Sequence, residues 1–204
     1  GDGDKDFVAG NLGWNSRLHA TSEKRVSLYV GDMDQNGGTD HLLTYFNNGR
    51  QYPFIPRDQL VKQVPSFKRK FLRYGNFREV TRESIIPGDE MANFAIVEAK
   101  CFSNVYIKND NGKLVVYPLP VQAQSFPIFS FCSGDFNSDG KIDLLAGGNM
   151  YAVQPDFGRY DAGYGLMLTG DGTGNFRPVP LQNSGFLVQG EVRVANAELD
   201  DMVL

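Results

Sequence analysis

The sequence has few cysteines, no excess of positive charge and no long apolar run. Two of its 204 residues are cysteine, Cys101 and Cys132, and without a CxxC pair they do not give the spacing of a zinc site. Because each lies in an apolar, strand-like run, we expect two buried, unpaired thiols, with a disulfide between them as the alternative. No run reaches the roughly 18 apolar residues that a membrane span needs. The formal net charge of -4 argues against nucleic acid as a partner.

The abundant residues favour strands and turns. The chain contains 23 Gly, 15 Phe and 9 Tyr, which are typical of turns and β-strands rather than of helices. A chain of this length can bury the core of one large all-β unit. We therefore expect a mainly β fold in which residues 1–204 form a single unit.

An acidic loop between strand-like runs occurs twice in full. The stretch GDMDQNGGTDHLL over residues 31–43 aligns without a gap on GDFNSDGKIDLL over residues 134–145. In both copies Asp or Asn occupies loop positions 1, 3 and 5, Gly occupies position 6 and Asp occupies position 9. The stretch DGDKDFVAGN over residues 2–11 matches the second half of the same unit. The sequence therefore contains three copies, of which the first is truncated.

Alternating oxygen-bearing side chains in a tight loop are typical of calcium sites. Ca²⁺ takes roughly six to eight oxygen ligands, and a backbone carbonyl can supplement the side chains. The expected side-chain ligands are Asp32, Asp34, Asn36 and Asp40 in the first loop and Asp135, Asn137, Asp139 and Asp143 in the second, and the expected carbonyl ligands are those of Gly38 and Lys141. In the truncated copy, Asp2 and Asp6 are expected to bind weakly or not at all, because the first ligands are missing.

The same loops admit two other interpretations. An EF-hand would need a bidentate Glu at position 12 and flanking helices, but this position falls on Leu43 and Ala146 in apolar strands. Alternatively, both loops are Asp/Asn/Gly hairpin turns that bind no metal, which are common in β proteins. Two full copies with the same flanking strands favour calcium binding over simple turns.

The strand pattern predicts propeller blades, each a four-stranded antiparallel sheet. Residues 126–182 are expected to form one blade, and residues 26–120 another that two or three short helices interrupt at about 52–92. Residues 1–25 would be the remainder of a truncated blade, and residues 185–204 the start of a further one. In the blade over 126–182, the strands are expected at residues 128–134, 143–146, 165–168 and 176–181.

These residues resemble the FG-GAP/VCBS repeat family, whose integrin-like propeller blades carry such calcium loops. More narrowly, three stretches look like the C-terminal region of bacterial ASPIC/UnbV-type surface proteins. These stretches are Tyr52-Pro53 with Arg57-Asp58-Gln59-Leu60, Pro118-Leu119-Pro120 with Ala123-Gln124, and Gly158-Arg159-Tyr160-Asp161 before Gly165. The resemblance implies an exported bacterial protein, at the cell surface, in the periplasm or secreted, that is linked to polysaccharide uptake. No signal peptide is visible in the sequence.

The chain departs from that family in two ways. Propellers of this type have about seven blades, whereas this sequence holds roughly two and parts of others, and helices interrupt one of them. An open arc of blades would expose strand edges, which proteins generally pair or cover. Self-association through exposed blade edges, or a missing remainder of the propeller, is therefore expected.

Two smaller features bear on ligand binding. The single tryptophan, Trp14, lies beside Asn15, so its ring could stack on a sugar, although a buried position inside a blade explains it equally well. Arg159 lies two residues before Asp161, and a structural contact between them is expected.

The leading hypothesis is a non-catalytic, calcium-binding module that binds a protein or a glycan. The alternatives are a glycan-active enzyme, either a hydrolase or a lyase, and a purely structural spacer. A glycan hydrolase would need two carboxylates roughly 5 to 10 Å apart in a pocket. Nearly all notable carboxylates already have the calcium spacing, and no nucleophile motif stands out, so the sequence favours a protein that is not an enzyme.

Overall fold

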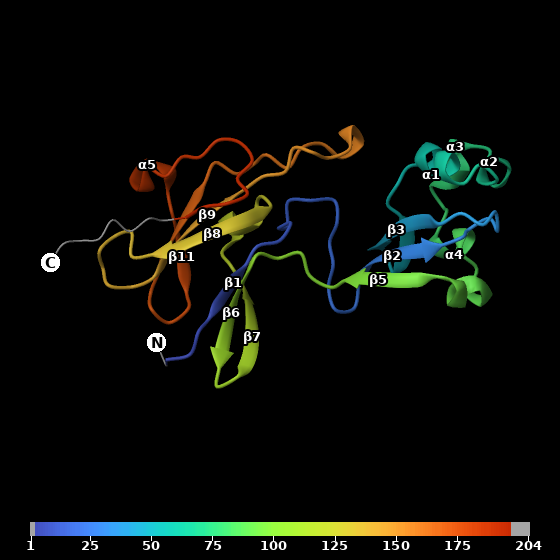
Figure 1. Cartoon of the computed structure of the whole chain (residues 1–204). Coiled ribbons are helices and arrows are strands. Elements are labelled where there is room, and N and C mark those ends of the chain that lie inside the picture. The colour runs from blue at the N-terminus through green and yellow to red at the C-terminus, as the bar shows by residue number, and fades with distance from the viewer. Residues whose placement is uncertain (1–2, 197–204) are drawn as a thin grey trace. The chain divides into compact units, whose positions relative to one another are not determined.

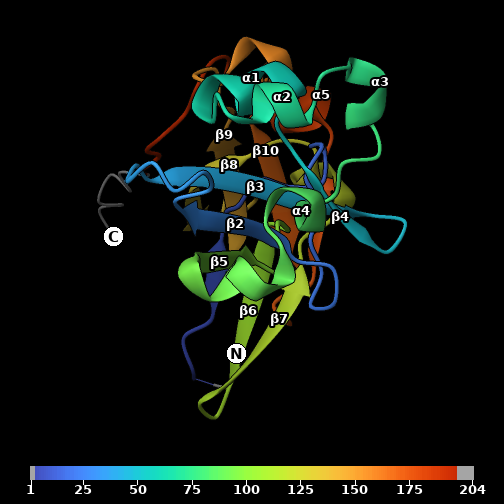
Figure 2. The same ribbon diagram turned by 90° about the vertical axis from the view of Figure 1, so that its right-hand side faces the viewer.

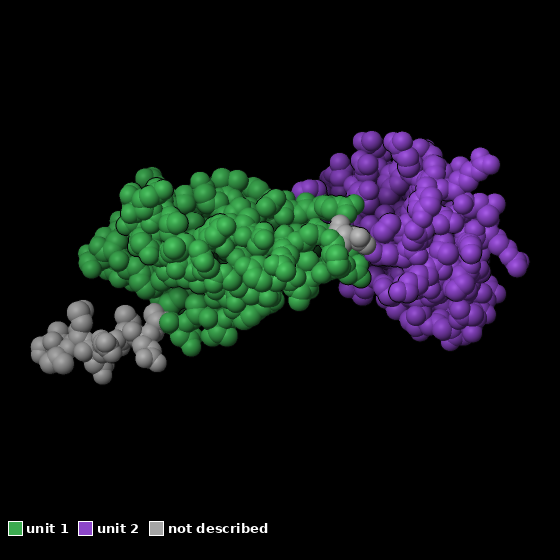
Figure 3. All heavy atoms as spheres, turned by 90° about the horizontal axis from the view of Figure 1, so that it is seen from above, with its two compact units in different colours: residues 1–17, 102–204 green, residues 18–101 purple. Residues whose placement is uncertain are grey.

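The structure is a computed structural model that describes residues 3–196. It is mainly β, as the composition predicts, with three antiparallel sheets of three or four strands and several short helices (Figures 1 and 2). The chain divides into two compact units: unit 1 comprises residues 1–17 and 102–204, and unit 2 comprises Leu18–Cys101 (Figure 3). None of the helices within residues 3–196 combines the length and the apolar character needed to cross a membrane.

Unit 2 is built on a four-stranded antiparallel sheet with the strand order β4-β3-β2-β5. Its strands are β2 (Val26–Gly31), β3 (Asp40–Asn47), β4 (Arg50–Pro53) and β5 (Ala95–Ala99). Asn48 and Gly49 both have positive φ, which is the geometry of a two-residue hairpin turn, and they join β3 to β4. Gly31 pairs with Asp40, so the first acidic loop joins the paired ends of β2 and β3.

Short helices between β4 and β5 cover one face of this sheet (Figure 2). They are α1 (Arg57–Gln63), α2 (Phe67–Lys70), α3 (Tyr74–Phe77), α4 (Arg82–Ile85) and the 3-10 helix η1 (Gly88–Asn93). Helix α1 starts after Pro56 and ends before Pro65, because proline suits a helix start and breaks a helix interior. Leu42, Leu60 and Ile86 are buried in one apolar cluster that joins sheet and helices. The helical insertion expected at about 52–92 is therefore present.

Unit 1 contains a four-stranded antiparallel meander with the strand order β11-β10-β9-β8. Its strands are β8 (Ile128–Gly134), β9 (Asp143–Gly148), β10 (Leu166–Gly170) and β11 (Phe176–Val179). These strands lie close to the ranges that the sequence pattern predicts. Gly134 pairs with Asp143, so the second acidic loop joins β8 to β9 in the same way as the first loop joins β2 to β3.

The other sheet of unit 1 has three strands in the order β1-β6-β7 (Figure 1). They are β1 (Phe7–Ala9), β6 (Val105–Asp110) and β7 (Lys113–Pro118). Val8 pairs with Tyr106, although the two residues are far apart in the sequence. Asn111 and Gly112 have positive φ and form the tight turn between β6 and β7.

The blade expected over residues 26–120 is not formed, because its strands belong to two different units. Strand β5 pairs with β2 inside unit 2, whereas residues 105–118 pair with β1 in unit 1. The sequence pattern locates each strand but does not encode which distant strand it joins, because that choice depends on tertiary contacts. Unit 2 is an insertion between β1 and β6, and the chain forms two units rather than one.

The remaining elements of unit 1 are short. They are the 3-10 helices η2 (Val121–Gln124) and η3 (Pro155–Phe157) and the helix α5 (Leu181–Ser184). Of the further blade expected at residues 185–204, no strand is formed within residues 185–196, and residues 197–204 lie outside the described chain. Val192 is held instead by a single backbone bond of 2.7 Å from its N–H to the carbonyl of Gly148.

Three side chains lie in surroundings other than those expected. Cys101 is exposed and Cys132 is half-buried, so the thiols do not belong to the buried core. Trp14 is 45% exposed, and its indole N–H donates to Ser103 Oγ at 2.8 Å. It is therefore not the buried core tryptophan of a blade, and its ring remains accessible to a ligand.

Candidate metal centres

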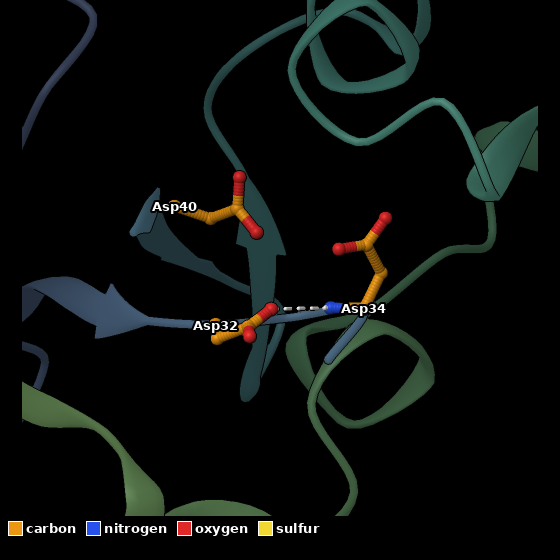
Figure 4. Close-up of side chains that lie close together, drawn as sticks. All are labelled: Asp32, Asp34 and Asp40. Atoms are coloured by element: carbon orange, nitrogen blue, oxygen red, sulfur yellow. Dashed lines mark hydrogen bonds between the residues drawn. The ribbon is translucent and has the colours of Figure 1, made fainter. Parts of the chain in front are cut away.

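Three carboxylates of the first acidic loop converge at the ends of β2 and β3 (Figure 4). Asp32, Asp34 and Asp40 each offer a carboxylate oxygen, and these oxygens lie within 4.8 Å of one another. Asp32 and Asp34 come from the loop after β2, and Asp40 is the first residue of β3. The structure thus brings together three of the four side-chain ligands that the sequence predicts for this loop.

The backbone of this loop wraps around the carboxylate of Asp32. Gln35 and Gly37 adopt positive φ values of 59° and 84°, which tighten the turn. The N–H of Gly37 donates to Asp32 Oδ2 at 2.7 Å, and the N–H of Asn36 donates to Asp32 Oδ1 at 3.1 Å. The bond from Gly37 is the main reason why the pKa of Asp32 lies below its ordinary value. Asp32 therefore stays ionised to a lower pH than an ordinary aspartate.

Asp34 and Asp40 supply a test of whether a cation fits this loop. Asp40 is buried, and its Oδ2 accepts the N–H of Met33 at 3.1 Å. Asp34 Oδ1 is buried and has no hydrogen-bond partner among the described residues. An unsatisfied buried carboxylate oxygen beside two other carboxylates is costly unless something neutralises it. A divalent cation would satisfy that oxygen, so the donor set fits Ca²⁺.

The second loop repeats the hydrogen bonds of the first in the other unit, but among the described residues its carboxylates do not form a group of three within 4.8 Å of one another. The N–H of Asp139 donates to Asp135 Oδ1 at 3.1 Å, and the N–H of Gly140 donates to Asp135 Oδ2 at 2.8 Å. The bond from Gly140 is the main cause of a lowered pKa of Asp135. Ser138 and Gly140 have φ values of 62° and 80°, which match their counterparts in the first loop. The N–H of Phe136 donates to Asp143 Oδ2 at 3.1 Å, as Met33 does to Asp40.

The expected ligands at positions 5 and 7 are linked to each other in both loops. Asn36 Oδ1 accepts the N–H of Gly38 at 2.6 Å, and Asp139 Oδ1 accepts the N–H of Lys141 at 2.9 Å. Each of these bonds fixes the backbone N–H of the residue whose own carbonyl is the expected ligand at position 7. The side chains at position 5 therefore orient the loop as well as offering an oxygen.

The second loop places its amide and its carboxylates at different positions from the first. Position 3 is the amide Asn137, whose Oδ1 accepts the N–H of Asp139 at 2.9 Å. Lys141 places its ammonium 3.9 Å from Asp139 Oδ2, and both side chains are largely exposed. An exposed ion pair of this kind contributes little and would be displaced readily by a divalent cation. Each loop carries three carboxylates and one amide, so the two candidate centres have the same formal charge on their side-chain ligands.

The truncated copy is organised differently. Asp6 Oδ2 accepts the hydroxyl of Tyr106 at 2.5 Å, and Asp6 Oδ1 accepts the N–H of Asn109 at 2.8 Å. The bond from Tyr106 is the largest cause of a lowered pKa of Asp6. Asp6 thus holds β1 against β6, and Asp2 lies outside the described residues.

One well-organised carboxylate was not singled out from the sequence. Asp171, at the turn between β10 and β11, accepts the N–H and the hydroxyl of Thr173 at 2.8 and 2.7 Å. It also accepts the amide side chain of Asn175 at 3.0 Å, and these bonds hold the pKa of Asp171 well below its ordinary value. The signal is the stretch DGTGN over residues 171–175, in which Asp precedes two turn glycines. Because its own turn engages both oxygens, we assign Asp171 a structural role.

Two hollows in unit 1 bear on the enzyme alternative. One has a volume of about 460 Å³ beside Tyr117 and Lys108, and the other has about 570 Å³ beside Asp6 and Lys141. Among the side chains that line these two hollows, Asp6 is the single carboxylate. A glycan hydrolase needs a pair, so neither hollow favours that chemistry.

Arg159, on the loop before β10, lies over the ring of Tyr151 at 5.4 Å rather than forming the expected contact with Asp161.

Comparison with known proteins gives no relative from which a function could be inferred, so the functional argument depends on this chain's own residues. No protein-family model matches the chain, and neither a curated protein nor a solved structure matches it. The resemblance to FG-GAP/VCBS repeats therefore stays a prediction from the sequence motifs. The geometry of the two acidic loops is the strongest functional feature of the chain.

Proposed function

We propose that this chain is a non-catalytic, calcium-binding repeat module of the β-propeller type. The observation that carries the proposal is that two loops on different sheets share the same backbone geometry. In both loops the Asp at position 1 accepts N–H groups from positions 5 and 6, and the Asp at position 9 accepts the N–H of position 2. Two independent copies of one arrangement support a shared ligand more strongly than a single acidic turn would.

Calcium would stabilise the module by neutralising each loop. Three carboxylates in one short loop repel one another, and a bound divalent cation removes that repulsion. The loops connect paired strands at Gly31 with Asp40 and at Gly134 with Asp143. A cation bound there would therefore lock the ends of these strand pairs.

We propose further that the module belongs to an exported bacterial protein and binds a glycan or a protein. The sequence motifs that resemble ASPIC/UnbV-type surface proteins support this setting. Exported proteins meet millimolar calcium, for which weak loops suffice. The exposed ring of Trp14 supports a glycan contact, because it presents an apolar surface beside the amide of Asn15.

Calcium titration of the chain, after treatment with a chelator, tests the proposal. We expect two binding events with dissociation constants on the order of 0.1–1 mM, by isothermal titration calorimetry. At ten times the dissociation constant, each site should add about 1.4 kcal/mol to the free energy of unfolding of its unit. The proposal would be contradicted if calcium injections released no heat of binding and if the melting temperature were the same in calcium and in chelator.

Variants separate the two loops. Asp34→Asn should weaken the site in unit 2 and leave the site in unit 1 intact, and Asp135→Asn should do the reverse. Asp89→Asn is the matched control, because Asp89 is an exposed aspartate of η1 outside both loops. If either single variant lost the calcium-binding heats of both loops, the two loops would not bind calcium independently.

A further inference from the structure

The three-stranded sheet of unit 1 corresponds to the four-stranded sheet without its first strand. Asp6 Oδ1 accepts the N–H of Asn109 at 2.8 Å, and Asp143 Oδ1 accepts the N–H of Gly170 at 3.0 Å. The residue after each aspartate pairs with a residue two positions before the donor, Phe7 with Ile107 and Leu144 with Leu168. Asp6 is thus equivalent to Asp143.

The far ends of the two strands are also equivalent. The carbonyl of Asn11 accepts the N–H of Ile128 at 3.0 Å, and the carbonyl of Gly148 accepts the N–H of Val192 at 2.7 Å. Asn11 and Gly148 each lie five residues after their aspartate. Strand β1 therefore occupies the place of β9, β6 that of β10, and β7 that of β11.

The equivalence shows what is missing beside β1. In the four-stranded sheet, the other edge of β9 pairs with β8 through six residue pairs from Ile128 to Gly134. The corresponding edge of β1 pairs with no strand within residues 3–196 (Figure 1). An open strand edge presents backbone N–H and C=O groups to any extended segment that can pair with it.

The hollow beside Asp6 and Lys141 adjoins β1 and is lined in part by apolar side chains. It has a volume of about 570 Å³, and its lining includes Phe7 and Val8 of β1, Leu144 of β9 and Phe176 of β11. Phe7 is 51% exposed, and Ile142 on the same hollow is 58% exposed. A strand added at β1 would place alternate side chains on each face of the sheet, so it can cover such apolar surface.

We propose that the open edge of β1 is an acceptor site for an extended strand of the β8 type that a partner polypeptide supplies. Such a strand would pair with β1 as β8 pairs with β9, by the addition of a strand to a sheet edge. Main-chain hydrogen bonds would supply affinity, and an apolar residue in the place of Ile128, which is buried, would supply specificity.

The described chain does not offer this strand itself. The segment that would start a further repeat, around Val192, is already held on the four-stranded sheet. Ala195 donates its N–H to Ser130 Oγ at 2.7 Å, and Asn149 donates its side-chain amide to the carbonyl of Gly190 at 2.9 Å. Arg193 also lies over the ring of Phe129 at 3.9 Å. The proposed occupant is therefore a strand of a partner polypeptide rather than of a second copy of this chain.

A synthetic peptide with the sequence of residues 126–140 is the probe. We expect saturable binding of the labelled peptide to the full chain by fluorescence anisotropy, in chelator as well as in calcium. Hydrogen exchange should show new protection at the amides of residues 7–9. A peptide of the same length with Ile128→Asp and Phe131→Asp should bind at least tenfold more weakly.

Two variants of the protein locate the site. Phe7→Lys should weaken binding of the peptide about tenfold, whereas Leu114→Lys should leave it unchanged. Both residues are exposed apolar side chains of the same sheet, but Leu114 lies on β7, at the opposite edge. Circular dichroism of both variants checks that they fold.

Three results would overturn the proposal. The first is no binding of the peptide to the unmodified chain. The second is binding that Leu114→Lys abolishes and Phe7→Lys does not, which would place the acceptor edge on β7. The third is self-association without peptide that protects residues 7–9, which would make a second copy the occupant. None of these results depends on whether the acidic loops bind calcium.

Discussion

Asp143 and Gly170 are joined by a buried hydrogen bond, in which the N–H of Gly170 donates to Asp143 Oδ1 at 3.0 Å. The other carboxylate oxygen accepts the N–H of Phe136 at 3.1 Å. Asp143 has no exposed surface, so its carboxylate replaces water as the partner of both N–H groups. The last aspartate of the loop therefore holds strand β10 even when no metal is bound.

Asp143→Ala should destabilise unit 1 in the presence of chelator. It leaves two N–H groups without an acceptor, at a cost of about 1–3 kcal/mol each where they are buried. Asp40→Ala should cost unit 2 less, because Asp40 accepts one such bond, from Met33. Urea unfolding followed by the fluorescence of Trp14, the single tryptophan, reports unit 1, and hydrogen exchange of β3 reports unit 2. Equal losses in the two units would contradict this account.

Gly37→Ala and Gly140→Ala should each destabilise the unit that contains them by about 1–2 kcal/mol. Both glycines have positive φ, and no atom lies within 4 Å of an added Cβ, so the cost comes from the backbone conformation alone. Gly88→Ala is the control, because Gly88 also has open space but no positive φ. Urea denaturation in chelator measures the difference. A loss in Gly88→Ala as large as in the other two would show that backbone conformation is not the cause.

Unit 2 should fold when residues 18–101 are produced alone. It has its own apolar core, in which Leu42 of β3 and Leu60 of α1 have no exposed surface. Its sheet is complete within the unit, because β5 returns to pair with β2. A cooperative thermal transition and dispersed amide resonances would be the expected result. A molten or unfolded chain would show that unit 2 depends on unit 1.

The insertion of unit 2 shows what local sequence patterns contain and what they omit. The spacing of the acidic residues predicted both loops, and the strands from Ile128 to Val179 lie close to their predicted ranges. Those features depend on residues that are neighbours in the chain. The pairing of Val8 with Tyr106 does not, because the whole of unit 2 lies between them in the sequence. The hairpin of β6 and β7 was therefore assigned to the wrong sheet.

The site was also only partly predictable. The candidate ligand set followed from the loop pattern, but the burial of Asp34 Oδ1 and the second acceptor role of Asp143 did not. Both depend on atoms outside the loop, such as the N–H of Gly170 in β10. Such contacts need the tertiary structure, whereas oxygen spacing needs only the sequence.

Acid should destabilise the metal-free protein through Asp32 and Asp135. Both have folded-state pKa values below the ordinary value, so each contributes stability above about pH 4 that is lost as the pH falls through the lowered pKa. The double variant Asp32→Asn and Asp135→Asn should start less stable at pH 6 and lose less between pH 4 and pH 2. Urea midpoints in chelator across this range measure the slope. Asp89→Asn should keep the slope of the unmodified chain.

Asn137→Asp should strengthen calcium binding in unit 1 and weaken the metal-free fold. The substitution gives the second loop four carboxylates, and the affinity of calcium loops rises with the number of charged ligands. The new carboxylate keeps an oxygen for the N–H of Asp139, now accepted by Asn137 Oδ1 at 2.9 Å. Without metal, however, it adds repulsion to Asp135 and Asp139, and part of that repulsion is offset by Lys141.

Asn137→Asp should therefore raise the affinity for calcium but lower the stability of the metal-free protein. We expect a several-fold lower calcium dissociation constant and a lower urea midpoint in chelator. Ser138→Asp is the matched control, since it adds the same charge at position 4, which the loop pattern does not use for a ligand. If both variants tightened calcium binding equally, the effect would come from general charge, and Asn137 would have no specific place in the site. If Asn137→Asp alone tightened binding, position 3 would be identified as a calcium ligand.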